Sequence, residues 1–332
     1  MKCRFVIALL LLSLAGISQV RSIDKVTITV SDVDKVKHFY EDAFGAKEIQ
    51  TNVFKGREME ALFSINDPTC EVKTSLMQIG KEYVELQSFK GKTTKPALIP
   101  EDSKSNDLWF QHIAIVVPDM EKAFEVIHRK MAVFVSTSQQ TLPNYITAAA
   151  GISAFYFRDP DGHNIEIIHF PSGKGNPKWQ SDTTSTFEGI DHTAIGIKNT
   201  DDAYTFYRDI LGMTIGGHSE NYGTEQEHLN QVFGARLWIT GMKAPEGIGI
   251  EFLQYLAPPG GRKYPANSHV YDLWHWHTTA RVDNIEDVYK KCVASKFRII
   301  SRVLVSIHQR NIGYTKAFLV RDVDGHAVLV TN

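Results

Sequence analysis

The sequence has little cysteine, little net charge and no long hydrophobic run in most of its length. It contains 3 cysteines in 332 residues, and its formal net charge is −2. So few cysteines do not make a disulfide framework, and a nearly neutral chain gives no reason to expect nucleic acid or an anionic membrane surface as a partner. The apolar run near the N-terminus spans about 13 residues, fewer than the roughly 20 of a spanning helix.

The residues on either side of that apolar run are typical of a secretory signal peptide. Lys2 and Arg4 precede the run, and "VRS" follows it, which predicts a signal peptide over residues 1–22. We therefore expect a secreted or periplasmic protein with no membrane association after removal of the signal. An uncleaved N-terminal anchor is the alternative. In the rest of the chain, Cys292 lies in a helical pattern that indicates a buried small side chain.

Four stretches of the sequence share one pattern, in which an alternating strand leads through a polar turn into an amphipathic helix. They begin at Lys25, His112, His192 and His277. Seven residues after each start stands a residue that favours a helix N-cap, namely Asp32, Asp119, Asn199 and Asn284. Two or three strand-like runs follow each helix, so each stretch is predicted to be a strand–helix–strand–strand–strand (βαβββ) module.

The modules indicate a duplicated pair. The first and third modules are alike, as are the second and fourth, and a segment rich in Gly, Pro, Ser and Thr separates the second from the third. We therefore expect an α+β protein in which the signal peptide at 1–22 precedes an N-terminal domain at 23–172. A linker at 173–187 and a C-terminal domain at 188–332 follow.

Three motifs carry a resemblance to a known family. "FYEDAFG" from Phe39, "FYRDILG" from Phe206 and the "RDPDGH" turn before Glu166 resemble the vicinal oxygen chelate superfamily of glyoxalases, bleomycin-resistance proteins and extradiol dioxygenases. The resemblance covers essentially the whole chain after residue 22. It implies four βαβββ modules paired into two open barrel-like domains. It also implies a divalent metal ion (Zn, Mn, Ni or Fe) held by the first and last strands of the modules.

The family's ligand positions fall on eight residues of this chain. In the N-terminal half they are Lys25, Glu85, His112 and Glu166, and in the C-terminal half they are His192, Glu251, His277 and Leu329. Two imidazoles and a carboxylate suit a first-row divalent metal. We therefore expect a site made of His192, Glu251 and His277, with Glu251 also acting as the catalytic base. The second set is His112, Glu166 and Glu85, where the alternative is a metal-free salt bridge from Lys25 to Glu85 or Glu166.

Further residues are candidates for substrate contact or for structural roles. Loops and strand ends around the C-terminal domain offer His275, Tyr222, Arg262 and Tyr264 as substrate contacts. The two histidines of the "DGH" turns, His163 and His326, are interpreted as turn residues.

Three functions are open within the family. The favoured one is a metal-dependent lyase or isomerase that acts on a small oxygen-rich substrate. The first alternative is a non-catalytic protein that sequesters a small molecule against aromatic walls, formed by Trp109, Phe110, Trp274 and Trp276. The second is an extradiol-type dioxygenase, which Tyr156 favours but Leu319 and the lack of a well-placed acid–base histidine disfavour. A homodimer is an open alternative to a monomer.

Overall fold

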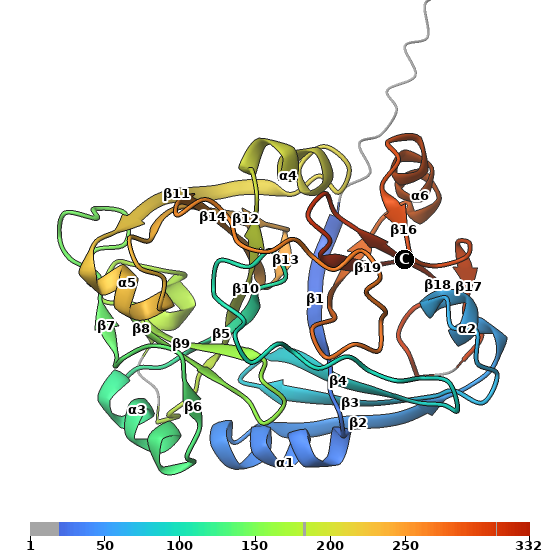
Figure 1. Ribbon diagram of the computed structural model, residues 1–332, viewed down its shortest axis with the longest axis horizontal. Coiled ribbons are helices and arrows are strands. Elements are labelled where there is room, and N and C mark those ends of the chain that lie inside the picture. The colour runs from blue at the N-terminus through green and yellow to red at the C-terminus, as the bar shows by residue number, and fades with distance from the viewer. Residues whose placement is uncertain (1–19, 182–183, 310) are drawn as a thin grey trace, which may run out of the picture.

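The protein is an α+β molecule built on two large open sheets. The computed structural model describes residues 20–181, 184–309 and 311–332. Figure 1 shows the two sheets side by side, with helices around them. The predicted fold class is therefore confirmed. Among the residues that the structure describes, no helix is both long and apolar enough to cross a membrane.

Sheet A has ten strands and combines the first module with the fourth, and the two-residue strand β13 of the third module pairs with β1 at its side. Its two central strands, β1 and β15, run antiparallel, and each has the last strand of its own module beside it in parallel. The strands of sheet A are β1 (Val20–Thr29), β2 (Lys47–Phe54), β3 (Glu71–Ile79), β4 (Glu82–Lys90), β13 (Glu246–Gly247), β15 (Trp276–Val282), β16 (Arg298–Ile299), β17 (Val305–Ser306), β18 (Lys316–Arg321) and β19 (Ala327–Thr331).

Sheet B has nine strands and combines the second module with the third. The pattern is the same: β5 and β10 are antiparallel in the centre, flanked in parallel by β9 and β14. The strands of sheet B are β5 (Gln111–Val116), β6 (Val133–Phe134), β7 (Gln140–Thr141), β8 (Ser153–Arg158), β9 (Asn164–His169), β10 (Gly189–Ile197), β11 (Thr214–Tyr222), β12 (Arg236–Lys243) and β14 (Gly249–Ala257).

The pairing of modules differs from the prediction. Each half of the sequence, 23–172 and 188–332, contributes one module to each sheet. Both sheets are therefore built across the linker, and neither is formed within one half of the chain. The ligand positions consequently combine in a different way from the one expected from chain order.

The helices begin where the predicted caps stand. Asp32, Asp119, Asn199 and Asn284 each accept a hydrogen bond from a backbone N–H of the first helical turn. The helices are α1 (Val33–Phe44), α2 (Arg57–Phe63), α3 (Met120–Arg129), α4 (Thr200–Tyr207), α5 (Thr224–Asn230), α6 (Ile285–Ala294) and the 3₁₀ helix η1 (Pro177–Gln180). The short helices α2 and α5 occur in the first and third modules, which agrees with the likeness of these two modules.

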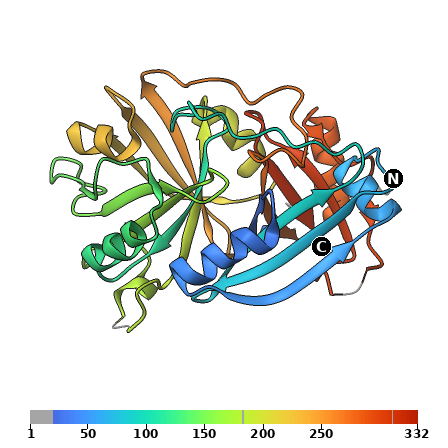
Figure 2. The same ribbon diagram turned by 60° about the horizontal axis from the view of Figure 1, so that its bottom comes forward.

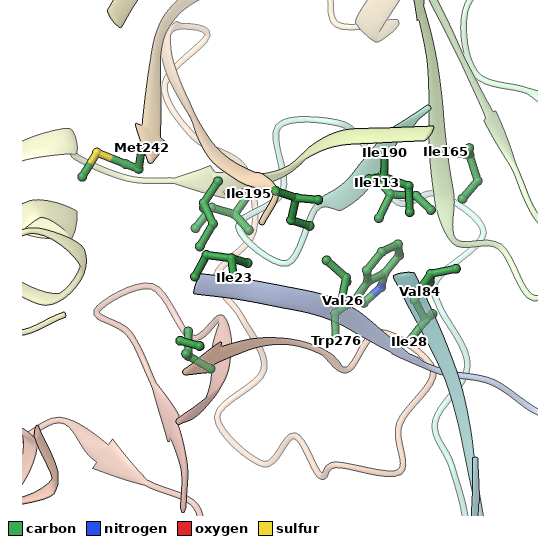
Figure 3. Packing of buried hydrophobic residues seen from close by; sticks show 14 of the residues in the cluster. Ile23, Val26, Ile28, Val84, Ile113, Ile165, Ile190, Ile195, Met242 and Trp276 are labelled. Atoms are coloured by element: carbon green, nitrogen blue, oxygen red, sulfur yellow. The ribbon is translucent and has the colours of Figure 1, made fainter. Parts of the chain in front are cut away.

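One continuous hydrophobic core joins the two sheets. Ile23, Val26 and Trp276 of sheet A lie near Ile113 and Ile190 of sheet B in this core (Figure 3). Helices α1, α3, α4 and α6 contribute buried residues to the same cluster, and Figure 2 shows α1 lying along β2, β3 and β4. Because strand side chains alternate, the neighbouring residues of each strand point to the opposite face, where the candidate ligands lie.

The N-terminal boundary of the fold also differs from the prediction. Residues 1–19 of the predicted signal peptide lie outside the described residues. Strand β1, however, begins at Val20, which is 1% exposed and pairs with Val282. Cleavage after residue 22 would therefore remove the first three residues of a strand in the middle of sheet A. The two described cysteines, Cys70 and Cys292, are buried and free, and the predicted burial of Cys292 is thus confirmed.

Candidate metal centre

Four candidate ligands lie on one face of sheet B. His112 of β5 is in register with Ala194 of β10, and His192 of β10 is in register with Ala114 of β5. The parallel neighbours complete the pattern. Glu166 of β9 pairs with Ala114, and Glu251 of β14 pairs with Ala194. The two alanines carry small side chains, so the imidazoles and carboxylates around them can converge.

Three of these side chains come close enough to share one metal ion. Among the residues that the structure describes, one group of three candidate ligands has its donor atoms all within 4.8 Å of one another: His112, Glu166 and His192. The distance from His112 Nε2 to Glu166 Oε2 is 3.2 Å, and that from His192 Nε2 to the same oxygen is 3.5 Å. Glu251 Oε2 lies 3.5 Å from His192 Nε2, on the border of the group.

The buried ring nitrogens fit a metal ion. Neither ring nitrogen of His112 has a hydrogen-bond partner, and neither does Nε2 of His192, although all three atoms are buried. The short contact from His112 to Glu166 lacks the geometry of a hydrogen bond. An unsatisfied buried polar group costs about 1–3 kcal/mol, and a coordinated cation would remove that cost for the nitrogens that face Glu166. Two imidazoles and a carboxylate also match the ligand preference of first-row divalent metals.

The electrostatics of the cluster favour a cation. Burial alone would raise the pKa of Glu166, but His112 and His192 outweigh it and hold that pKa at about 2. Burial raises the pKa of Glu251 to about 7, assisted by the charges of Glu166 and Asp191 and opposed by that of His192. Burial would lower the pKa of His192, but Glu251, Asp191 and Glu166 raise it well above its ordinary value. Three carboxylates thus surround two imidazoles.

A cavity of about 540 Å³ opens above the cluster. Glu166, His192 and Glu251 line it, and the side chain of Glu251 is 29% exposed. Apolar side chains from β8, β9, β12 and β14 form much of the remaining wall. The cavity has the size of a small-molecule site with a few convergent polar groups.

The equivalent face of sheet A carries a salt bridge. Lys25 and His277 occupy the positions of the two histidines, and Glu85 and Leu329 occupy those of the two glutamates. Lys25 Nζ donates to Glu85 Oε1 at 2.7 Å, which is the ion pair that the alternative for these two residues predicts. Burial, together with the charge of Lys25, lowers the pKa of His277 to about 3. Leu329 belongs to an apolar cluster with side chains of α2.

The two predicted ligand sets are therefore divided between the sheets. Sheet B brings His192 and Glu251 of the first set together with His112 and Glu166 of the second. It does not bring in His277, because this residue lies on β15 of sheet A. Glu85 likewise lies on β4 of sheet A.

The predicted substrate contacts lie apart from the cluster. Arg262 forms ion pairs with Asp102 and Asp107, and the hydroxyl of Tyr264 donates to the carbonyl oxygen of Trp274. His275 is fully buried beside His277. Tyr222 is partly exposed at the end of β11 and contacts the ring of Tyr145; none of the four lines the cavity.

The predicted aromatic walls do not surround the cavity either. Trp276 lies in the core between the sheets (Figure 3). The indole N–H groups of Trp109 and Trp274 donate to Ser103 and Ser268, each at 2.8 Å.

The two "DGH" histidines are turn residues, and they also connect the two sheets. Nδ1 of His163 faces the carboxylate of Asp159, and Nε2 lies 3.0 Å from the carbonyl oxygen of Thr29 in sheet A. In the matching contact, Nε2 of His326 lies 2.8 Å from the carbonyl oxygen of Gly196 in sheet B.

Two residues beside the cluster were not predicted from the sequence. His218 of β11 lines the cavity, and its ring stacks on Trp238. Asp191 precedes His192 and contacts its ring. His218 follows two glycines in a strand without apolar alternation, so no signal identified it. The repetition of an aspartate before Lys25 and before His192 could have pointed to Asp191.

Comparison with known proteins identifies the class of protein. The chain belongs to the Glyoxalase/Bleomycin resistance protein/Dioxygenase superfamily, whose model matches residues 22–167 and 189–330. The resemblance predicted from the sequence is thereby confirmed. Among curated proteins, none matches this sequence.

Solved structures show the same fold at low sequence identity. Glyoxalase I from Zea mays is 15% identical, with a TM-score of 0.57, and the match covers 95% of this chain and 92% of that chain. A protein from Bacillus subtilis, provisionally assigned as a dioxygenase, is 14% identical, with a TM-score of 0.55 and coverage of 94% and 85%. At these identities the likeness concerns the fold.

Proposed function

We propose that the sheet B cavity is the active site of a divalent-metal-dependent lyase or isomerase that acts on a small oxygen-rich molecule. The observation that carries the proposal is the buried group of His112, Glu166 and His192, with unpartnered ring nitrogens, at the base of a small-molecule cavity. The glyoxalase I among the similar structures supports this function, whereas the protein assigned as a dioxygenase supports the alternative.

The residues of the site have two roles, because some would hold the cation and one would transfer a proton. His112, Glu166 and His192 would hold the metal, which when bound supplies Lewis acidity to substrate oxygens. Glu251 lines the cavity beside the group, with its Oε2 3.5 Å from Nε2 of His192, so its carboxylate is placed to accept a proton from a bound substrate and return it. The apolar wall of the cavity excludes water from the substrate around these groups.

The first test is metal content together with turnover. We expect about one Zn, Mn, Ni or Fe ion per chain in protein purified without chelators, and a loss of that ion in a His112→Ala/His192→Ala variant. Glu251→Gln should keep the metal but lower kcat by about 10²- to 10⁴-fold on any turned-over α-hydroxycarbonyl compound. Glu85→Gln, the matched change in sheet A, should leave kcat unchanged.

The same measurement separates the alternatives. Stoichiometric metal without turnover, together with tight binding of an organic ligand, would favour a sequestering protein. Consumption of O₂ with a catechol would favour a dioxygenase. No metal in the wild type, even after reconstitution with all four ions, would overturn the proposal.

Secretion and dimerisation are part of the proposal. Secretion rests on the N-terminal sequence, and detection of the protein in the medium of expressing cells tests it. A homodimer is tested by light scattering of the purified protein.

A further inference from the structure

A β-bulge places a second polar side chain beside His192. The register of β10 against β5 shifts between Ile190 and His192, so Asp191 is an extra residue in the strand. Such a bulge redirects side chains and often lies next to a functional site. Here Asp191 and His192, although adjacent in sequence, both line the cavity.

Asp191 connects the histidine to the segment between the two halves of the chain. Its Oδ2 lies 3.0 Å from Nδ1 of His192, and its Oδ1 accepts a hydrogen bond from the indole N–H of Trp179 in η1. Both contacts use side-chain atoms, and they lie on opposite oxygens of one carboxylate. Rotation of the Asp191 carboxylate would therefore break at least one of these two contacts.

Trp179 is itself held in place. Lys178 Nζ lies 4.1 Å from the centre of the Trp179 ring and donates to Glu82 at 2.7 Å. The other oxygen of Glu82 accepts from the backbone N–H of Ile190 at 3.2 Å. Gly189 makes this approach possible, because a Cβ there would lie 2.1 Å from Glu82 and 2.9 Å from the Trp179 ring.

We propose that Asp191, fixed by Trp179, is the positioning residue that orients His192 for metal binding. The hydrogen bond keeps the proton of His192 on Nδ1 and directs Nε2 toward Glu166. Carboxylates that accept from the far nitrogen of a ligand histidine set its tautomer and raise its affinity for metal. The inference rests on the proposed metal site and adds a role for the segment between the halves.

Sheet A provides a matched comparison. Its strand β1 has the same bulge, with Asp24 before Lys25. Asp24 accepts from Arg281 at 2.7 and 3.1 Å. The aspartate is thus present at both bulges, but in sheet B its partners are a candidate ligand and a tryptophan.

The test is metal affinity measured by chelator competition with Zn²⁺ and Mn²⁺. Asp191→Ala should weaken binding by about 10- to 100-fold. Asp191→Asn, which keeps an acceptor oxygen, should weaken it less, and Trp179→Phe should also weaken it. The controls are Asp24→Ala at the matched bulge and Trp109→Phe, which loses a comparable indole hydrogen bond. Both should bind metal as the wild type does.

A second readout reports on the histidine directly. In the metal-free protein, NMR with ¹⁵N-labelled histidine should show a low-field Nδ1 proton for His192 that is lost in Asp191→Ala and shifted in Trp179→Phe. The inference would be overturned if Asp191→Ala and Asp24→Ala bound metal with equal affinity while thermal unfolding showed that both variants are folded. If Asp191→Ala does not fold, the metal affinities of Asp191→Asn and Trp179→Phe are compared with those of the two controls instead, and equal affinities would again overturn the inference.

The two proposals fail in distinguishable ways. A wild type that binds no metal overturns the proposed function. The low-field proton then still decides whether Asp191 orients His192, and its absence from the wild type overturns the positioning role.

Discussion

Exchanges at equivalent residues separate the chemistry of the two sheets. His192 corresponds to Lys25, and Glu166 corresponds to Leu329, because each pair holds the same place in the strand register. An ammonium group neutralises Glu85 in sheet A, whereas the carboxylates of sheet B face two imidazoles with unpartnered nitrogens. The fold is the same on both sides, so side-chain identity alone changes the type of site.

His163 makes a testable contribution to stability at the residue scale. Burial would lower the pKa of His163, but Asp159, with help from the charge of Asp161 and the carbonyl oxygen of Leu273, raises it above its ordinary value of 6.5. The folded protein therefore binds this proton more tightly than the unfolded chain does. The stabilisation is fully present below about pH 6.5 and is lost as the pH rises through the raised pKa. His163→Phe should lower the free energy of unfolding by about 1–3 kcal/mol at pH 6, and by less at higher pH.

Urea unfolding across this pH range measures the effect. His38→Gln is the control, because it removes a histidine that lies exposed on α1. Parallel pH profiles for the wild type and His163→Phe would show that the ion pair with Asp159 does not contribute to stability.

At the scale of the element, the contribution of the first residues of β1 to stability can be tested by comparing chains that begin at different residues. Val20 is buried in the core, and its backbone N–H donates to Leu211 at 2.8 Å. A chain beginning at residue 23 should be less stable than one beginning at residue 20 by about 1.5–3 kcal/mol, the value of one buried valine. Denaturant unfolding of the two proteins measures the difference. Equal midpoints would mean that the first three residues of β1 add nothing, and that cleavage after residue 22 is compatible with the fold.

Local elements could be predicted from the sequence, but the pairing of modules could not. A helix N-cap depends on residues that are neighbours in sequence, so Asp32 and the three equivalent residues were identified correctly. The first strands of all four modules alternate in the same way, and alternation reveals which face is buried but not which strand lies alongside. His192 and His277 are equivalent by this criterion. Their separation into two sheets follows from contacts distant in sequence, which the pattern does not contain.

At the scale of the whole molecule, the two halves of the chain are joined through both sheets. The central pairs β1–β15 and β5–β10 each connect one half to the other. Strand β13 adds a further link from the third module to β1, where a Cβ on Gly247 would lie 1.9 Å from the carbonyl oxygen of Ile23. Neither half contains a complete sheet, so we expect the halves to unfold together.

The same arrangement predicts that the protein has one metal site, on sheet B, and that sheet A holds equivalent strand positions where a second site could be built by substitution. Lys25→His would place two histidines and Glu85 on sheet A, because His277 already occupies the equivalent position on β15. We expect the metal content to rise from about one to about two ions per chain, since the donor types would then match those of sheet B.

Lys25→Met is the control of similar length, and it should leave the metal content at about one. It should also lower the free energy of unfolding by about 1–3 kcal/mol, because Glu85 would lose its charged partner in a half-buried position and keep only the hydrogen bond from Thr27. Two ions in the wild type would show that the salt bridge does not prevent binding. One ion in folded Lys25→His would show that Leu329, which replaces a carboxylate, is what removes the site from sheet A.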